Sequence, residues 1–266
     1  MVDYQAYEHL IVEKRDGIAL ITMNRPEVYN ATNARLHYEL GRIWLAIGED
    51  AEVRVAVITG AGTAFSAGGD FDLIEGFLGN PLAIASTMKE ASDIVYNILN
   101  LDKPVISAIN GIAVGAGLAV ALMADISIAS EKARFTDGHL RLGVGAGDHS
   151  VIIWPLLCGM ARAKRYLLTA DFLDAREAER IGLVSMVVPH EQLMSTAMEF
   201  AHKLAAGPQP AMHWTKRALN QWLRVMGPAF DYSLATEMLG FFGPDVKEGL
   251  HALREKRDPN FPTARS

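Results

Sequence analysis

The sequence has a single cysteine and no excess of positive charge, and both features narrow its possible roles. With Cys158 alone, the chain can form no internal disulfide bond, which suits a reducing cytoplasm. Its 25 lysine and arginine residues are outnumbered by 31 aspartate and glutamate residues, and the net charge of -6 argues against nucleic-acid binding. The N-terminus also lacks the basic and then apolar order of a signal peptide. We therefore expect a cytoplasmic protein with no nucleic-acid partner.

Long hydrophobic runs are scarce as well. One stretch, residues 105–124, contains no charged residue and is long enough for a membrane span. Asn110 and three glycines interrupt it, and no second such stretch occurs in the chain. We therefore expect a buried strand over residues 105–109, a glycine-rich turn and an apolar helix over residues 118–124, with no membrane association.

What the sequence does contain is a repeated order of buried strand, small-residue loop and helix. Residues 53–59 and residues 105–109 both read as buried strands, and glycine-rich loops follow them. This order predicts an α/β fold in which parallel strands are joined by helical crossovers. Strand patterns end near residue 189, so we expect a core domain over residues 1–189 and a helical C-terminal region over residues 190–266.

The two glycine-rich loops are candidates for a functional site. Gly68-Gly69 precedes one expected helix, and Gly115-Ala116 precedes another. The backbone N–H groups at a helix start have no partner within the helix, and the helix dipole favours negative charge there. If the two strands are neighbours, one N–H from each loop could bind a single carbonyl oxygen. Close packing without any ligand would require the same small residues.

Several motifs occur in an order that closely resembles the crotonase (enoyl-CoA hydratase/isomerase) superfamily, from Leu10 to the C-terminus. They are Phe65-Ser66-Ala67-Gly68-Gly69-Asp70, Lys103-Pro104-Val105-Ile106, Asn110-Gly111, Gly115-Ala116-Gly117, Asp125-Ile126, Ala175-Arg176-Glu177-Ala178 and Gly182-Leu183-Val184. The resemblance implies a spiral core of repeated ββα units and a helical C-terminal trimerisation region. It also implies a homotrimer or a dimer of trimers.

The same resemblance assigns roles to individual residues. The N–H groups of Gly69 and Ala116 would form an oxyanion hole for an acyl-thioester carbonyl. Ala67, with Gly68, would lie along coenzyme A, and Lys256 matches a tail position that often reaches the CoA phosphates. A solvated tail charge is the alternative for Lys256. Coenzyme A would enter as part of the substrate, and no tightly bound cofactor is expected.

The sequence departs from the family at its acid–base residues. A hydratase of this family holds water between two glutamates, whose positions here are occupied by Ala119 and His139. His139, Asp148 and the following Trp154-Pro155 are similar to the 6-oxocamphor hydrolase branch, whose members cleave a C–C bond between carbonyls. There the histidine and the aspartate serve catalysis. An aspartate can orient an imidazole and stabilise the imidazolium formed when water gives up its proton.

Other interpretations of these residues stay open. Asp148 also stands where a helix N-cap belongs, and His139 could be a buried core histidine. His149 could replace His139. Glu237, on an amphipathic C-terminal helix, is expected to be solvated, and the alternative is that it faces the site, as in the related hydrolases. No cysteine, histidine and aspartate cluster has metal-ligand spacing, so no metal site is predicted.

We therefore predict a crotonase-superfamily enzyme acting on an acyl-CoA thioester. The backbone oxyanion hole would stabilise an enolate, and His139 and Asp148 would activate water in place of the glutamate pair. Two alternatives remain: a CoA-independent hydrolase that cleaves a C–C bond of a β-diketone, and a non-catalytic binding protein with the crotonase fold.

Overall fold

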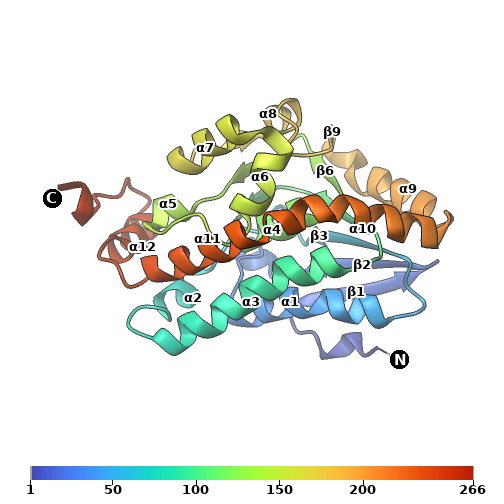
Figure 1. Ribbon diagram of the computed structural model, residues 1–266, viewed down its shortest axis with the longest axis horizontal. Coiled ribbons are helices and arrows are strands. Elements are labelled where there is room, and N and C mark those ends of the chain that lie inside the picture. Colours follow the sequence, from blue (N-terminus) through green and yellow to red (C-terminus); the bar gives the residue numbers. More distant parts are fainter. Residues whose placement is uncertain (1, 266) are drawn as a thin grey trace.

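The structure is a computed structural model that describes residues 2–265, and its strands form two sheets (Figure 1). The larger has six strands in the order β1-β2-β3-β4-β6-β9, and the smaller has three in the order β5-β7-β8. The strands are β1 (Leu10–Arg15), β2 (Ile18–Met23), β3 (Val55–Gly60), β4 (Val105–Ile109), β5 (Ile112–Val114), β6 (Ile126–Ser130), β7 (Arg134–Thr136), β8 (Leu173–Asp174) and β9 (Met186–Val188).

The larger sheet is parallel from β2 onward, as the sequence predicts. Only β1 and β2 are antiparallel, and they are joined by a tight turn in which Asp16 and Gly17 both have positive φ. Every residue of β3 and β4 is buried, because helices cover both faces of a parallel sheet. The two strands pair directly, with Ala56 opposite Val105, so the loops that follow them leave the same edge of the sheet.

The smaller sheet arises because the chain turns sharply after a strand of the larger one. Asn110-Gly111 separates β4 from β5, and a similar short connection separates β6 from β7. The Asn110 side chain stabilises the turn between β4 and β5 by donating to the carbonyl oxygens of Gly60, Gly62 and Ala64. A strand in each sheet and then a helix make up the repeating unit.

Twelve α-helices surround the sheets within residues 2–265. They are α1 (Ala34–Glu49), α2 (Phe71–Glu75), α3 (Pro81–Asn100), α4 (Gly115–Met123), α5 (His139–Leu142), α6 (Ser150–Cys158), α7 (Met160–Thr169), α8 (Ala175–Arg180), α9 (Leu193–Ala205), α10 (Gln209–Val225), α11 (Gly227–Gly240) and α12 (Asp245–Glu255).

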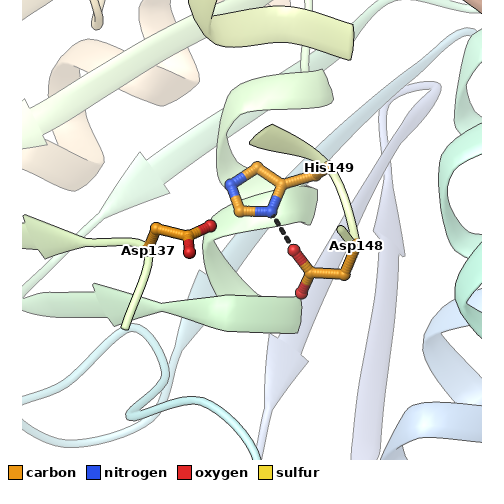
Figure 2. A group of neighbouring side chains, drawn as sticks. All are labelled: Asp137, Asp148 and His149. Atoms are coloured by element: carbon orange, nitrogen blue, oxygen red, sulfur yellow. Dashed lines mark hydrogen bonds and ion pairs between the residues drawn. The ribbon is translucent and has the colours of Figure 1, made fainter. Parts of the chain in front are cut away.

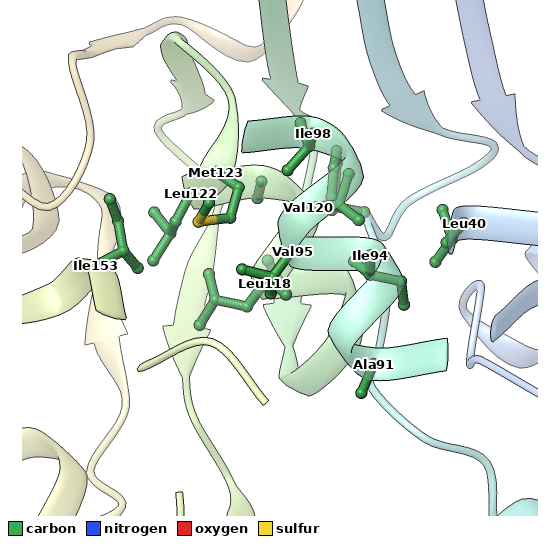
Figure 3. Packing of buried hydrophobic residues seen from close by; sticks show 14 of the residues in the cluster. Leu40, Ala91, Ile94, Val95, Ile98, Leu118, Val120, Leu122, Met123 and Ile153 are labelled. Atoms are coloured by element: carbon green, nitrogen blue, oxygen red, sulfur yellow. The ribbon is translucent and has the colours of Figure 1, made fainter. Parts of the chain in front are cut away.

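Helix α4 lies at the centre of the core. Eight of its nine residues are buried, and their side chains pack between those of α3 and Ile153 of α6 (Figure 3). On the opposite side of the larger sheet, α9 packs through Leu193, Ala197 and Ala201. No helix in the described part of the chain is long and apolar enough to cross a membrane, and the uncharged stretch 105–124 is divided between two strands and α4.

All strands end before residue 189, and only helices follow. These C-terminal helices pack on the rest of the molecule: α11 lies along α3 and also contacts α6. The Tyr96 hydroxyl of α3 donates to Asp231 of α11 at 2.8 Å. The C-terminal region therefore forms part of the wall around the site described next.

Candidate functional site

The two glycine-rich loops lie side by side. The Val114 N–H donates to the Ser66 carbonyl oxygen at 3.0 Å, and Ser66 pairs with Ala113 in a parallel β-bridge. A Cβ placed on Gly115 would lie 3.6 Å from the Gly68 Cα. The loops therefore run in the same direction and then enter α2 and α4 next to each other.

The helix after the second loop begins earlier than the sequence analysis expected. It starts at Gly115, not at Leu118, so the Gly115-Ala116-Gly117 segment is its first turn. Among residues 2–265, neither the Ala116 N–H nor the Gly69 N–H donates a hydrogen bond. Both predicted oxyanion donors are thus available on adjacent segments.

Both loops open into a cavity of about 640 Å³. Its walls are mainly apolar and come from α1, α2, α3, α5 and α11. The predicted site residues on its lining are Ala67, Gly68, Gly69, Ala116, His139 and Asp148. Lys256 is exposed and does not line this cavity, and Ala119 is buried in the core.

His139 stands at the start of α5 with three carboxylates around its ring. Its Nδ1 donates to Asp137 Oδ1 at 2.8 Å. On the other side, Nε2 lies 3.7 Å from Asp148 Oδ2 and 3.4 Å from Glu237 Oε1. The residue that orients the ring is therefore Asp137, not Asp148 as the sequence suggested. Asp137 lies only two residues before His139, but it was not a candidate because only Asp148 matched the catalytic aspartate of the 6-oxocamphor hydrolase branch.

The carboxylates control the charge of this imidazole. Burial alone would lower the pKa of His139, but Asp137, Asp148 and Glu237 together outweigh it and raise that pKa well above the ordinary 6.5. Burial likewise opposes ionisation of Asp137 and Asp148, yet the nearby His139 cation leaves both pKa values lowered. Burial dominates at Glu237 and raises its pKa. The charges around the site thus favour an imidazolium at His139 and carboxylates at Asp137 and Asp148.

Glu237 takes the alternative position, facing the site, and not the solvated position that was expected. It was expected in solvent, but it is 4% exposed and its Oε2 has no hydrogen-bond partner among the described residues. Its side chain fits because Gly147 has no Cβ: one there would lie 2.6 Å from Glu237 Oε2. The sequence signal that was available for this contact is Gly147, the glycine directly before Asp148.

Asp148 is held by its neighbour instead of capping the next helix. His149, not Asp148, occupies the N-cap position of α6, and its side chain makes no cap. His149 Nδ1 donates to Asp148 Oδ1 (Figure 2). Its Nε2 accepts from the Trp154 indole N–H at 3.4 Å. This arrangement leaves Asp148 Oδ2 to face His139 Nε2 at 3.7 Å, and it lies 3.9 Å from the position a Cβ on Gly115 would take.

Asp137, Asp148 and His149 offer ligand atoms within 4.8 Å of one another, a cluster that their spacing in the chain did not predict. Figure 2 shows the His149 ring between the two carboxylates. Both ring nitrogens of His149 are engaged, and Asp137 accepts from His139 and from the Ser150 hydroxyl. A cation would have to replace these hydrogen bonds, so the cluster fits an acid–base network better than a metal centre.

The chain is similar in sequence and structure to enzymes of one family. The profile described as enoyl-CoA hydratase/isomerase matches residues 13–264. A probable enoyl-CoA hydratase of Rhizobium meliloti is 36% identical over 96% of this chain and 98% of its own length. A crotonyl-CoA hydratase of Syntrophomonas wolfei is 34% identical, with coverage of 96% and 98%.

Solved structures agree with these relatives. An enoyl-CoA hydratase/isomerase from Mycobacterium paratuberculosis aligns with a TM-score of 0.88 and 34% identity, covering 91% of this chain and 97% of its own. A β-diketone hydrolase from the cyanobacterium Anabaena, bound to (S)-3-oxocyclohexyl acetic acid, aligns with a TM-score of 0.83 and 33% identity, covering 90% and 96%. These similarities confirm the crotonase fold expected from the sequence.

Proposed function

Because the chain belongs to the enoyl-CoA hydratase/isomerase family, we propose that it adds water to the acyl group of a CoA thioester, using His139 and Asp148 in place of a glutamate pair. The observation that carries this proposal is the His139 ring, set between carboxylates on a cavity that the two glycine-rich loops also line.

The loops would stabilise the negative charge that develops during the reaction. Attack on carbon 3 of an enoyl thioester places charge on the thioester oxygen as an enolate. The N–H groups of Gly69 and Ala116 would donate to that oxygen, and one such donor is worth about 3–4 kcal/mol. Ala67 and Gly68 would lie along the CoA portion, and Lys256 remains a candidate for its phosphates.

His139 and Asp148 together supply the proton donor and the proton acceptor that hydration requires. One group must accept a proton from water, and another must give a proton to carbon 2. In a glutamate pair these are one carboxylate and one carboxylic acid. Here Asp148 Oδ2 would accept the proton, and the His139 imidazolium would supply one through Nε2. Asp137 would hold the ring by Nδ1 throughout, as the aspartate of a catalytic triad does.

The test is the rate of hydration of crotonyl-CoA, followed by loss of the conjugated thioester absorbance. We expect His139→Gln and His139→Ala to lower kcat by about 10²–10⁴-fold, the usual contribution of a positioned acid or base. His251→Ala removes an exposed histidine of α12 and should leave the rate unchanged. Wild-type turnover that persists in folded His139→Gln would remove His139 from the mechanism.

A second candidate function is CoA-independent hydrolysis of a β-diketone. The neighbour bound to (S)-3-oxocyclohexyl acetic acid favours it, as does the absence of Lys256 from the cavity wall of the described chain. Here Asp148 would take a proton from water attacking one carbonyl. The C–C bond would break to give a carboxylic acid, and His139 would protonate the enolate to give a ketone.

Affinity for free coenzyme A separates the two functions. Binding measured by calorimetry, together with turnover of crotonyl-CoA, supports the thioester substrate. No binding at millimolar CoA, with turnover of a cyclic 1,3-diketone, supports C–C hydrolysis. If a panel of enoyl thioesters and diketones gave no turnover, the chain would be a binding protein with this fold.

A further inference from the structure

A second polar group faces the cavity away from the acid–base cluster. His37 of α1 is 5% exposed and lines the same cavity as His139. Its neighbours on the lining are mainly apolar, including Ile74, Phe77 and Ala91. A polar side chain in such a place costs free energy unless its hydrogen bonds are satisfied, so its partners are informative.

One nitrogen of His37 is satisfied and the other is not. Nδ1 donates to Glu90 Oε2 of α3 at 2.9 Å, and the second oxygen of Glu90 accepts from the Ser86 hydroxyl at 3.4 Å. Glu90 is thus held through both oxygens, and it fixes the His37 ring. Among residues 2–265, His37 Nε2 has no hydrogen-bond partner, yet it is not sealed from solvent. Nε2 is therefore the atom left to meet a ligand in the cavity.

The backbone places this nitrogen near the two glycine-rich loops. Thr32, just before α1, is fastened to the first loop by two hydrogen bonds: its N–H donates to the Gly68 carbonyl oxygen and its own carbonyl oxygen accepts from the Asp70 N–H. Helix α1 then begins from the Asn33 cap, and His37 follows one turn later, roughly 6 Å along the axis. His139, in contrast, comes from α5, which lies well apart from α1 and α3 (Figure 1).

We infer that His37, oriented by Glu90, is a specificity-determining residue that hydrogen-bonds a second oxygen of the substrate. This inference deepens the proposed function, since it takes the reacting carbonyl to lie at the glycine-rich loops. The substrate class is then a compact apolar acyl group or ring that carries a hydroxyl or carbonyl oxygen a few bonds beyond the reacting carbonyl. A plain hydrocarbon chain would leave Nε2 without a partner.

The test measures the affinity of the protein for ligands, so that it does not depend on turnover. Two ligand series are titrated by calorimetry. One comprises hexanoyl-CoA, 5-hydroxyhexanoyl-CoA and 5-oxohexanoyl-CoA, and the other comprises cyclohexylacetic, 3-hydroxycyclohexylacetic and 3-oxocyclohexylacetic acids. We expect the wild type to bind an oxygenated member about three- to tenfold more tightly than its hydrocarbon counterpart. Preference for the hydroxyl or for the carbonyl tells whether Nε2 accepts or donates.

His37→Leu should abolish that preference while leaving affinity for the hydrocarbon member within about twofold, because only the hydrogen bond is removed. Thr87→Val is the matched control, since it removes another polar side chain from the lining and should keep the preference. The inference is overturned if the wild type shows no preference in either series or binds neither. It is also overturned if the preference survives His37→Leu or is lost in Thr87→Val.

These outcomes are distinct from failure of the proposed function. If no thioester binds but the ring acids bind with a preference that His37→Leu removes, the thioester proposal fails and the role of His37 stands. If thioesters bind and are hydrated without any preference, the proposed function stands and the role of His37 fails.

Discussion

At the scale of single residues, the charge of His139 is set by what surrounds it. A neutral imidazole could remove a proton from water, but an imidazolium cannot. Because Asp137, Asp148 and Glu237 together raise the pKa of His139, we propose that the ring enters the reaction as the proton donor and Asp148 as the acceptor. From the sequence, the ring was expected to take a proton from water, because Asp148 was the only carboxylate assigned to it.

This assignment has a pH dependence with a definite sign. Under this proposal, activity requires a protonated His139 and an ionised Asp148, whose pKa values are raised and lowered respectively. We expect kcat/KM to be level through neutral pH, to fall as pH rises through the raised pKa of His139, and to fall at acid pH, below the ordinary aspartate value of 3.8. A rate profile from pH 3 to pH 10 checks this. A rise in rate across the neutral range would instead make neutral His139 the base.

Asp137→Asn isolates the orienting carboxylate. The substitution keeps the shape of the side chain but removes the negative charge of the carboxylate that faces His139 Nδ1. We therefore expect kcat to fall by about 10²–10⁴-fold. Loss of one partner from a buried charged pair should also lower the free energy of unfolding by about 3 kcal/mol. Asp171→Asn, at an exposed aspartate, is the control and should change neither quantity.

The stability difference should itself depend on pH. Asp137 has a lowered pKa, so its stabilisation is present above the ordinary 3.8 and is lost as pH falls through the folded value. His139 has a raised pKa, so its share is fully present below 6.5 and is lost as pH rises through the folded value. Urea unfolding should therefore show the largest gap between wild type and Asp137→Asn between these pH values. A gap that is constant from pH 3 to pH 10 would contradict the pairing.

At the scale of elements, the two loops depend on how closely α4 approaches Ser66. A Cβ on Gly117 would lie 2.3 Å from the Ser66 Cβ, and Ser66 cannot retreat, because it is fully buried and its hydroxyl donates to the Asn30 carbonyl oxygen. Gly117→Ala should thus push the first loop away from α4. We expect a loss of about 1–3 kcal/mol in the free energy of unfolding and a fall in kcat.

Gly48→Ala is the matched control, since it adds the same methyl group in α1 and meets only an ordinary contact of 3.5 Å with Leu101. It should be neutral or slightly stabilising, because alanine favours helix more than glycine does. Thermal unfolding and crotonyl-CoA hydration measure both variants. Equal stability and equal rates for the two variants would show that the Gly117 contact is not needed.

The elements also show where sequence reasoning works. Strands with a strong pattern, such as β3 and β4, were predicted to within two residues of their ends, since their apolar runs determine them locally. The strand β5 and the helix α5 were not predicted. They have three and four residues, and they form because of neighbours distant in sequence: β5 pairs with β7. The start of α4 was misplaced because its glycines resemble a turn, although tertiary packing makes them helical.

At the scale of the whole molecule, the site combines segments that no local pattern links. Motif order identified Gly69, Ala116, His139 and Asp148 as candidates, and all of them line one cavity. Glu237 could not be placed in this way, because its position depends on α11 folding back over Gly147. The side of an amphipathic helix that meets the core is a property of the folded chain.

One helix face is left without a partner within the described chain. Helix α10 turns Lys216 and Asn220 inward, where they donate to the Lys103 and Leu99 carbonyl oxygens. On its other side, Trp214, Trp222 and Val225 are about two-thirds exposed, with values of 67%, 71% and 68%. Indole rings presented together in this way mark a surface that binds another protein.

We predict that this face joins copies of the chain, as a homotrimer or a dimer of trimers. Charge at the centre of such an interface is costly to bury, so Trp214→Glu combined with Trp222→Glu should reduce the mass measured by light scattering to that of a single chain. Leu82→Glu, at another exposed apolar residue that is 82% exposed, is the control and should keep the wild-type mass. A wild type that is monomeric at micromolar concentration would contradict the prediction. So would a double variant that retains the oligomer, since the face would then serve a different partner.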